Sequence, residues 1–239
     1  MEQTKAAIAQ IEELVAGVPG WTPIDELYSL FCLAMSTAGM AGDVVEVGAW
    51  CGRSSVVLGL AARLLGNCKV VSIDLFPERS DWIENPDGTY SFEVVIDGRR
   101  YGGYKEHRVW REPYERDIRP LYESSNGVLE IFDRVVAERG LTGTVCGIKG
   151  TSEVVPRLQK DGLRCRLAFI DGDHSYEAVC RDIVHIERVL ATGGWICFDD
   201  AFSHYDGVNR AITERIVESG RYVVAQQMTR KLFVAKRAR

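Results

Sequence analysis

Two short apolar runs near the middle of the chain organise its hydrophobic pattern. Residues 167–170 and 195–198 are continuous apolar stretches, as expected of parallel strands that are covered on both faces. Between them, apolar residues recur at helical spacing over 176–190. The pattern predicts a strand–helix–strand unit, and its right-handed crossover makes the two strands parallel.

The remaining pattern predicts an α/β domain built around this unit. Thr22 is an expected N-cap, with Pro23 at the first helical position, and Ser152 is expected to cap a later helix. The last two strands should form an antiparallel hairpin. We expect a single domain over 1–239 with a helical cover over 1–42. The expected helices are 4–16, 22–39, 53–65, 127–139, one after Ser152 and 207–218, and the expected strands are 43–47, 70–74, 144–148, 222–225 and 232–235.

A segment rich in aromatic and turn residues interrupts this pattern over 77–126. Residues 90–96 followed by Asp97-Gly98 have the signature of a hairpin. The segment is too long for an ordinary connection, and long loops in compact domains often serve as lids or binding loops. It is either an insertion that shapes an acceptor pocket or an arm that faces solvent or forms an oligomer.

Composition excludes several functional classes. The formal net charge is −5 without a long basic run, which disfavours nucleic-acid binding. No apolar run approaches the roughly 18 residues of a membrane span, and the charged start of the chain does not resemble a signal peptide. The seven cysteines contain no C-x-x-C pair, as is typical of free thiols. We expect a cytoplasmic protein.

Carboxylates follow the two central strands directly. Asp171 ends the first, in Asp171-Gly172-Asp173-His174, and Asp199-Asp200 end the second. Ligands bind open α/β sheets at the carboxyl edge, so these acids should converge there. Hard oxygen ligands suit Mg²⁺ or Ca²⁺. The alternative is that the acids cap helices or pair with Arg and Lys.

A second candidate site follows the strand at 43–47. Gly48 and Gly52 form a tight turn into a helix, with Glu46 just before the turn. Asp74 ends the next strand, and an acid at that place typically binds a ribose diol. The glycine spacing is neither the G-x-G-x-x-G of dinucleotide sites nor a phosphate loop. The alternative is a simple strand–helix turn.

Four motifs in this order and spacing resemble those of class I S-adenosylmethionine-dependent methyltransferases. Within that class they are similar to the magnesium-dependent sugar O-methyltransferases of the macrocin and mycinamicin type. The resemblance implies a Rossmann-like, seven-stranded, mostly parallel sheet that ends in an antiparallel hairpin. The motifs are V-V-E-V-G-A-W-C-G-R-S-S, V-V-S-I-D, F-I-D-G-D-H-S-Y and G-G-W-I-C-F-D-D.

The resemblance also implies roles for individual residues. Asp171, Asp199 and Asp200 would bind Mg²⁺, and Asp74 would hold the cofactor's ribose. The general base would be Asp173 or His174, of which we favour His174 because an imidazole pKa near 6.5 suits the task. His204 is a further candidate for the pocket. The methionine end of the cofactor would contact Glu46, Gly48, Gly52 and Ser54, the adenine would lie near Gly150, Thr151 and Ser152, and Asp171 would also adjoin the cofactor.

The expected reaction is methyl transfer from S-adenosylmethionine to a hydroxyl of a sugar, glycoside or related natural product. Other hypotheses stay open: a catechol-like phenolic acceptor, a same-fold metal protein that transfers no methyl, a dinucleotide-dependent oxidoreductase, and a non-catalytic assembly protein. The sequence also leaves a homo-oligomer open.

Overall fold

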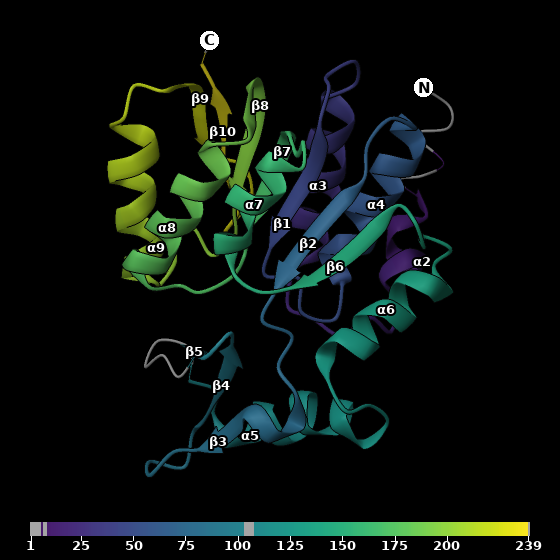
Figure 1. Ribbon diagram of the computed structural model, residues 1–239, viewed down its shortest axis with the longest axis vertical. Helices are drawn as coiled ribbons and strands as arrows, with labels where there is room; N and C mark the ends of the chain where they lie inside the picture. The colour runs from purple at the N-terminus through teal and green to yellow at the C-terminus, as the bar shows by residue number, and fades with distance from the viewer. Residues whose placement is uncertain (1–5, 7–8, 103–107, 239) are drawn as a thin grey trace.

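A seven-stranded sheet forms the centre of the protein (Figure 1). The computed structural model describes residues 6, 9–102 and 108–238. The strand order is β6-β2-β1-β7-β8-β10-β9, parallel from β6 to β8, with β10 antiparallel to both neighbours. The strands are β1 (Asp43–Val47), β2 (Val70–Asp74), β6 (Val145–Lys149), β7 (Cys165–Ile170), β8 (Leu190–Phe198), β9 (Tyr222–Gln227) and β10 (Phe233–Arg237). The expected fold, including its terminal hairpin, is confirmed.

Helices cover both faces of this sheet (Figure 1). Residues 4, 5, 7 and 8 of the first expected helix lie outside the described residues, and α2 lies within the remainder. The helices are α2 (Ile11–Val15), α3 (Ile24–Ser36), α4 (Arg53–Leu65), α6 (Val128–Glu138), α7 (Val155–Lys160), α8 (Tyr176–Glu187) and α9 (Asp206–Ile212), with short helical turns η5 (Ser152–Val154) and η6 (Thr213–Val217).

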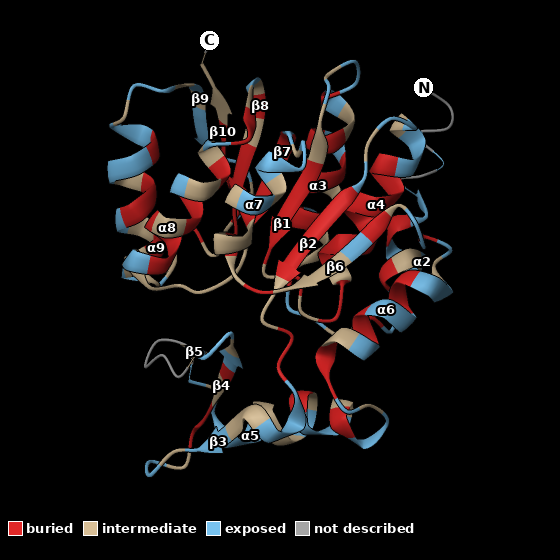
Figure 2. Ribbon diagram, viewed as in Figure 1, coloured by how far each residue is buried: buried red, intermediate tan, exposed pale blue. Residues whose placement is uncertain are grey.

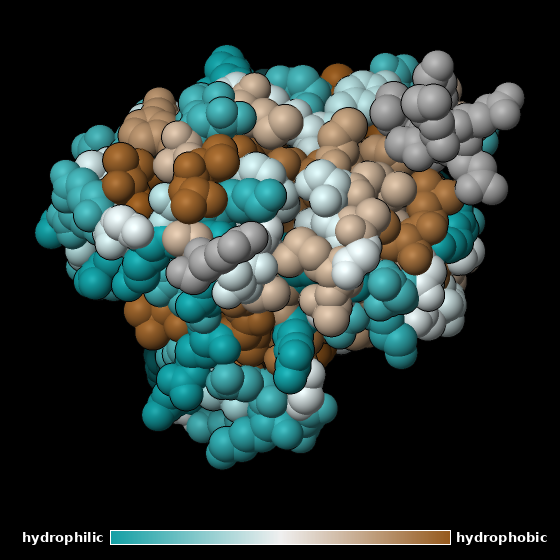
Figure 3. Space-filling view, turned by 90° about the horizontal axis from the view of Figure 1, so that it is seen from above, coloured by the Kyte–Doolittle hydropathy of each residue, from teal (hydrophilic) through white to brown (hydrophobic). Residues whose placement is uncertain are grey.

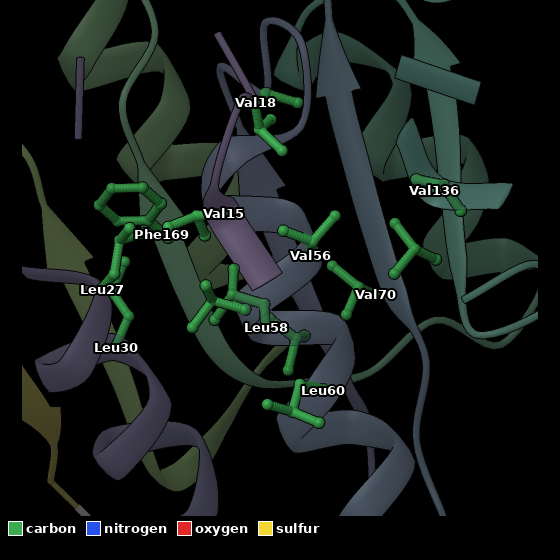
Figure 4. Packing of buried hydrophobic residues seen from close by; sticks show 14 of the residues in the cluster. Val15, Val18, Leu27, Leu30, Val56, Leu58, Leu60, Val70, Val136 and Phe169 are labelled. Atoms are coloured by element: carbon green, nitrogen blue, oxygen red, sulfur yellow. The ribbon is translucent and has the colours of Figure 1, made fainter. Parts of the chain in front are cut away.

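Strand alternation divides the core into two clusters. Val44 and Phe169 face α2, α3, α4 and α6, whereas Val45 and Ile170 face α7, α8 and α9. Figure 4 shows Leu27, Val56 and Phe169 within the first cluster. The central strands are buried almost throughout (Figure 2), as their continuous apolar runs predict.

The segment 77–126 forms a small lobe beyond the carboxyl end of β2 (Figure 1). The predicted hairpin is confirmed, and a third strand extends it into a separate sheet. Residues 103–107 of this segment lie outside the described residues. The lobe contains η1 (Arg79–Asp81), β3 (Trp82–Glu84), β4 (Tyr90–Ile96), β5 (Arg99–Gly102), α5 (Arg111–Pro113), η3 (Tyr114–Ile118) and η4 (Arg119–Glu123).

Two predicted helix caps differ from the structure. Pro23 occupies the N-cap position of α3, so Thr22 lies one residue outside it. Thr151, rather than Ser152, accepts the backbone N–H of Glu153 at the start of η5. The Ser152 hydroxyl does not cap the helical turn because it contacts His185 instead.

Among the described residues, no helix combines the length and apolar character needed to cross a bilayer. On the face seen in Figure 3, groups of hydrophobic side chains are separated by hydrophilic ones.

Candidate active site

A cavity of about 450 Å³ lies at the carboxyl ends of the parallel strands and extends to the lobe. Backbone hydrogen bonds continue the ladder past the strand ends: Asp171 N–H donates to Val47 O, and Asp199 N–H donates to Ile170 O. The residues that directly follow β1, β7 and β8 therefore lie side by side at one edge of the sheet. Of the predicted site residues, Gly48, Ser54, Asp74, Gly150, Thr151, Asp171, Asp173, His174, Asp199 and Asp200 line this cavity.

The turn after β1 packs tightly against the turn after β7. A Cβ on Gly48 would lie 2.0 Å from the carbonyl oxygen of Asp171, and Gly48 has a φ of +90°. Only glycine fits such a position. The sequence suggested that this glycine lets the backbone approach a ligand; the close approach in the structure is to the neighbouring chain segment.

Asp74 joins this turn to β2. Its carboxylate accepts the backbone N–H groups of Ala49 and Trp50, at 2.9 and 3.0 Å, and that of Phe76 at 2.6 Å. Burial raises the pKa of Asp74, and these three hydrogen bonds oppose the increase. A carboxylate has about four lone-pair sites, so capacity remains for one more donor in the cavity.

Glu46 points away from the cavity. Its strand position faces α4, and its fully buried carboxylate accepts the hydroxyls of Ser54, Ser55 and Ser72. Burial raises its pKa, while the serine hydroxyls act in the opposite direction. Within the described chain, neither Glu46 nor Gly52 lines the cavity. Glu46 therefore ties the first turn of α4 to β1 and β2.

A buried polar chain that the sequence did not indicate borders the cavity beneath Thr151. Asp182 on α8 lines the cavity and is hydrogen-bonded to Ser152, whose Oγ lies 3.0 Å from Nδ1 of His185. Burial raises the pKa of Asp182 to about 7, although the Ser152 bond counteracts it. The helical period places Asp182 and His185 on one face of α8.

The three predicted metal ligands converge, as expected from the parallel strands. Within the same cavity, Lys231 from the turn before β10 lies between two of them. Its Nζ is 3.0 Å from Asp199 Oδ2 and 3.1 Å from Asp200 Oδ1. The attraction of these two carboxylates raises the pKa of Lys231, although burial opposes it. Pairing with a lysine was the alternative that the sequence left open.

A fourth carboxyl joins the cluster from the helical cover. Glu26 on α3 is fully buried, accepts the Thr229 hydroxyl at 3.2 Å and interacts with Asp199. Burial, followed by repulsion from Asp199, raises the pKa of Glu26 to about 9. The pKa of Asp171 is also raised, first by burial and then by Asp199. Glu26 is therefore protonated at pH 7 in this arrangement.

The cluster as arranged does not fit the expected Mg²⁺ ion. The carboxylate oxygens are suitable donors, but Mg²⁺ requires near-octahedral coordination at about 2.0–2.1 Å. The ammonium of Lys231 already lies against both Asp199 and Asp200, and the described residues contain no group of three side chains arranged to hold a metal.

His174 and Asp173 border the acidic cluster. His174 Nε2 lies 3.1 Å from Asp200 Oδ2, and its ring stacks on Tyr205 with centroids 4.0 Å apart. Burial would raise the pKa of Asp200, but the bond from His174 and the charge of Lys231 lower it to about 2. Asp173 Oδ1 accepts the Ser175 N–H, whereas its buried Oδ2 has no hydrogen-bond partner among the described residues. His204 packs on Tyr205, outside the described lining of the cavity.

Aromatic rings form a further part of the cavity wall. Trp21 and Trp50 are 5.7 Å apart, and Trp50 and Trp82 are 6.5 Å apart. Trp82 continues this run into the lobe, where its Nε1–H donates to Tyr122 Oη. Phe92, Tyr101 and Trp110 of the lobe also line the cavity.

Comparisons with known proteins agree with this architecture. The sequence pattern of the methyltransferase domain family matches residues 45–201. Three solved structures share the fold. The O-methyltransferase NovP is 16% identical, with a TM-score of 0.63, and the match covers 90% of this chain and 81% of NovP. CalS11, a TDP-rhamnose 3'-O-methyltransferase of calicheamicin biosynthesis, is 18% identical, with a TM-score of 0.55 and coverages of 97% and 93%.

The third structure is TomG from Streptomyces achromogenes, an O-methyltransferase involved in tomaymycin synthesis, in complex with S-adenosylmethionine. It is 14% identical, with a TM-score of 0.56, and the match covers 99% of this chain and 90% of TomG. At these identities the likeness concerns the fold, whereas the family match extends over most of the chain, from β1 to just beyond β8. The chain therefore belongs to the methyltransferase domain family and has the fold of S-adenosylmethionine-dependent O-methyltransferases.

Proposed function

We propose that this protein transfers a methyl group from S-adenosylmethionine to a hydroxyl of a sugar, a glycoside or a related natural product. One observation carries the proposal: a single cavity in a methyltransferase-domain chain joins the glycine turn after β1 to the His174–Asp200 pair. A methyl donor beside the turn and a hydroxyl beside the histidine would meet within it.

The cofactor is proposed to lie against the ends of β1, β2 and β6. The remaining acceptor capacity of Asp74 suits a ribose hydroxyl. Gly48 and Ser54 line the cavity beside it, and Gly150 and Thr151 line it at the end of β6. Asp182 lines the same end and is the acid that an adenine amino group could donate to. Glu46 would act indirectly, by holding Ser54.

His174 is proposed as the general base. Removing the hydroxyl proton during attack is worth roughly 10²–10⁴-fold in rate. Asp200 faces the imidazole and stabilises the imidazolium that would form, as an aspartate does beside a catalytic histidine. Asp173 is the alternative base, because its Oδ2 is buried at the cavity.

The aromatic wall supports an acceptor with an apolar face. Trp21, Trp82 and Trp110 line the cavity, and such rings pack against sugar faces and against aromatic rings. NovP, CalS11 and TomG are O-methyltransferases, and CalS11 acts on a TDP-sugar. These names favour a sugar or natural-product hydroxyl; a catechol-like phenol is the alternative acceptor.

The family resemblance implies magnesium dependence, but no step described above needs a magnesium ion.

Seven free cysteines suit the reducing cytoplasm, which we propose as the location.

Calorimetry and product detection test this proposal. S-adenosylmethionine should bind and NAD should not, and incubation with a panel of sugars, glycosides and catechols should yield S-adenosylhomocysteine together with a methylated product. Binding without product from any acceptor would favour a same-fold protein that transfers no methyl. Binding of NAD in place of S-adenosylmethionine would contradict the proposal.

A further inference from the structure

We propose that Lys231 is the resident cation of this site: its ammonium, held by Asp199 and Asp200, contacts the acceptor oxygen, and methyl transfer proceeds without a divalent metal. This inference rests on the proposed methyl transfer and assigns the electrostatic part of that reaction to a side chain of the protein itself.

The contacts of Lys231 leave one donor for a ligand. An ammonium has three N–H donors, and two of them are directed at Asp199 Oδ2 and Asp200 Oδ1. The Lys231 side chain is 15% exposed and lines the cavity. The third donor is therefore available to an oxygen bound next to His174, which contacts the other oxygen of Asp200.

The backbone holds Lys231 in this position from both sides. Its carbonyl accepts the Ala201 N–H at 2.8 Å, directly after the Asp199-Asp200 pair. The Thr229 hydroxyl accepts the N–H groups of Lys231 and Leu232, and it donates to buried Glu26. Leu232 is fully buried. Lys231 is thus anchored to β8 and to α3, unlike a mobile surface lysine.

An ammonium already occupies the position between Asp199 and Asp200. Lys231 Nζ lies 3.0 Å from Asp199 Oδ2 and 3.1 Å from Asp200 Oδ1. A divalent ion bound by both carboxylates would have to displace this ammonium, which the backbone contacts of Lys231 hold in place.

The proposed step balances atoms and charge. The acceptor O–H bond breaks and its proton goes to His174, while Lys231 stabilises the developing negative charge on the oxygen. The oxygen forms a bond to the sulfonium methyl carbon, and the electron pair of the broken C–S bond stays on sulfur. The products are a methyl ether, S-adenosylhomocysteine and an imidazolium.

Metal removal tests the inference on the wild-type protein. After treatment with EDTA and buffer exchange, the rate of S-adenosylhomocysteine formation should be unchanged, and added Mg²⁺ should not increase it. A large loss of rate that Mg²⁺ restores would overturn the inference.

Substitution of Lys231 gives two further readouts, turnover and metal binding, and the second needs no turnover. Lys231→Met should reduce turnover by roughly 100-fold or more, as removal of a transition-state donor does, while Lys236→Met on the same hairpin should leave it unchanged. Mn²⁺ titration followed by electron paramagnetic resonance should detect no bound ion in the wild type. Lys231→Met should gain a bound ion, and the double variant Lys231→Met with Asp199→Asn should lose it again.

Bound Mn²⁺ in the wild type, or full turnover by Lys231→Met, would overturn the inference. If Lys231→Met melts at a much lower temperature than the wild type, Lys231→Arg and the wild-type Mn²⁺ titration carry the test. A protein that neither binds S-adenosylmethionine nor forms product would contradict the proposed function, whereas the Mn²⁺ result would still report on Lys231.

Discussion

At the residue scale, burial of single acids creates a pH dependence that the surface charges do not predict. Asp182 has a pKa of about 7 in the folded protein, against about 3.9 for an unfolded aspartate. Between these values the folded protein holds a proton that the unfolded chain has released. The contribution of Asp182 to stability therefore decreases as the pH rises through this window and levels off above pH 7.

Asp182→Asn should remove this dependence. The amide oxygen can still accept the Ser152 hydroxyl, and no charge has to be buried. We expect the melting temperature of the wild type to fall more between pH 5 and pH 8 than that of the variant, with the variant at least as stable at pH 8. Exposed Asp161→Asn is the control, and equal slopes in all three proteins would show that Asp182 does not carry the proton.

At the element scale, the turn after β1 is positioned by its contact with the turn after β7. Gly48→Ala would place a Cβ 2.0 Å from Asp171 O, whereas Gly39, which also has a positive φ, has no neighbouring atom within 4 Å. Gly39→Ala should cost about 1 kcal/mol of unfolding free energy, and Gly48→Ala more than about 3 kcal/mol.

Urea unfolding of the two variants measures this difference. If Gly48→Ala does not fold and Gly39→Ala does, the result also indicates a large loss of unfolding free energy in Gly48→Ala. Equal costs would show that strain from φ, rather than packing of the two turns, requires the glycine.

The lobe is the element that we expect to determine acceptor affinity. Trp110 lines the cavity but is 71% exposed, so it has apolar surface to cover with a ligand. Trp110→Ala should raise the KM for the acceptor about tenfold, a cost near 1.4 kcal/mol, with an unchanged Kd for S-adenosylmethionine. Val95→Ala, an exposed residue of the same lobe, should change neither value. Weaker cofactor binding with an unchanged acceptor KM would assign Trp110 to the cofactor instead.

At the scale of the whole molecule, the two ends of the sheet have separate tasks. The carboxyl ends carry the cavity, whereas Arg166 is fully buried in β7 toward the other end, where it donates to Gly42 O and to Asn67. These hydrogen bonds satisfy a buried guanidinium without a carboxylate, so losing them should affect stability alone.

Arg166→Lys should lower the free energy of unfolding by about 1.5–3 kcal/mol, because a single ammonium cannot replace the charged hydrogen bonds, and kcat should stay unchanged. His174→Ala should show the opposite: a kcat lower by roughly 10²–10⁴-fold and little change in unfolding. Denaturant unfolding and turnover of both variants provide the comparison, and a large fall in kcat of a folded Arg166→Lys protein would contradict the separation.

The sequence determined the sheet, its parallel core and the convergence of the three aspartates. Continuous apolar runs specify buried strands, and crossovers specify which strand ends meet, so the sequence alone assigns Asp171, Asp199 and Asp200 to one edge of the sheet.

Tertiary structure alone decided what these acids contact. Lys231 is 31 residues from Asp200 along the chain, and its arrival depends on the register of the β9–β10 hairpin; Glu26 comes from a helix that the pattern identifies only as a cover. Glu46 was expected at the cofactor, yet its strand position turns it toward three serines. Local periodicity specifies which residues are buried. The partner of a buried charge depends on contacts between distant segments, and no local pattern encodes these.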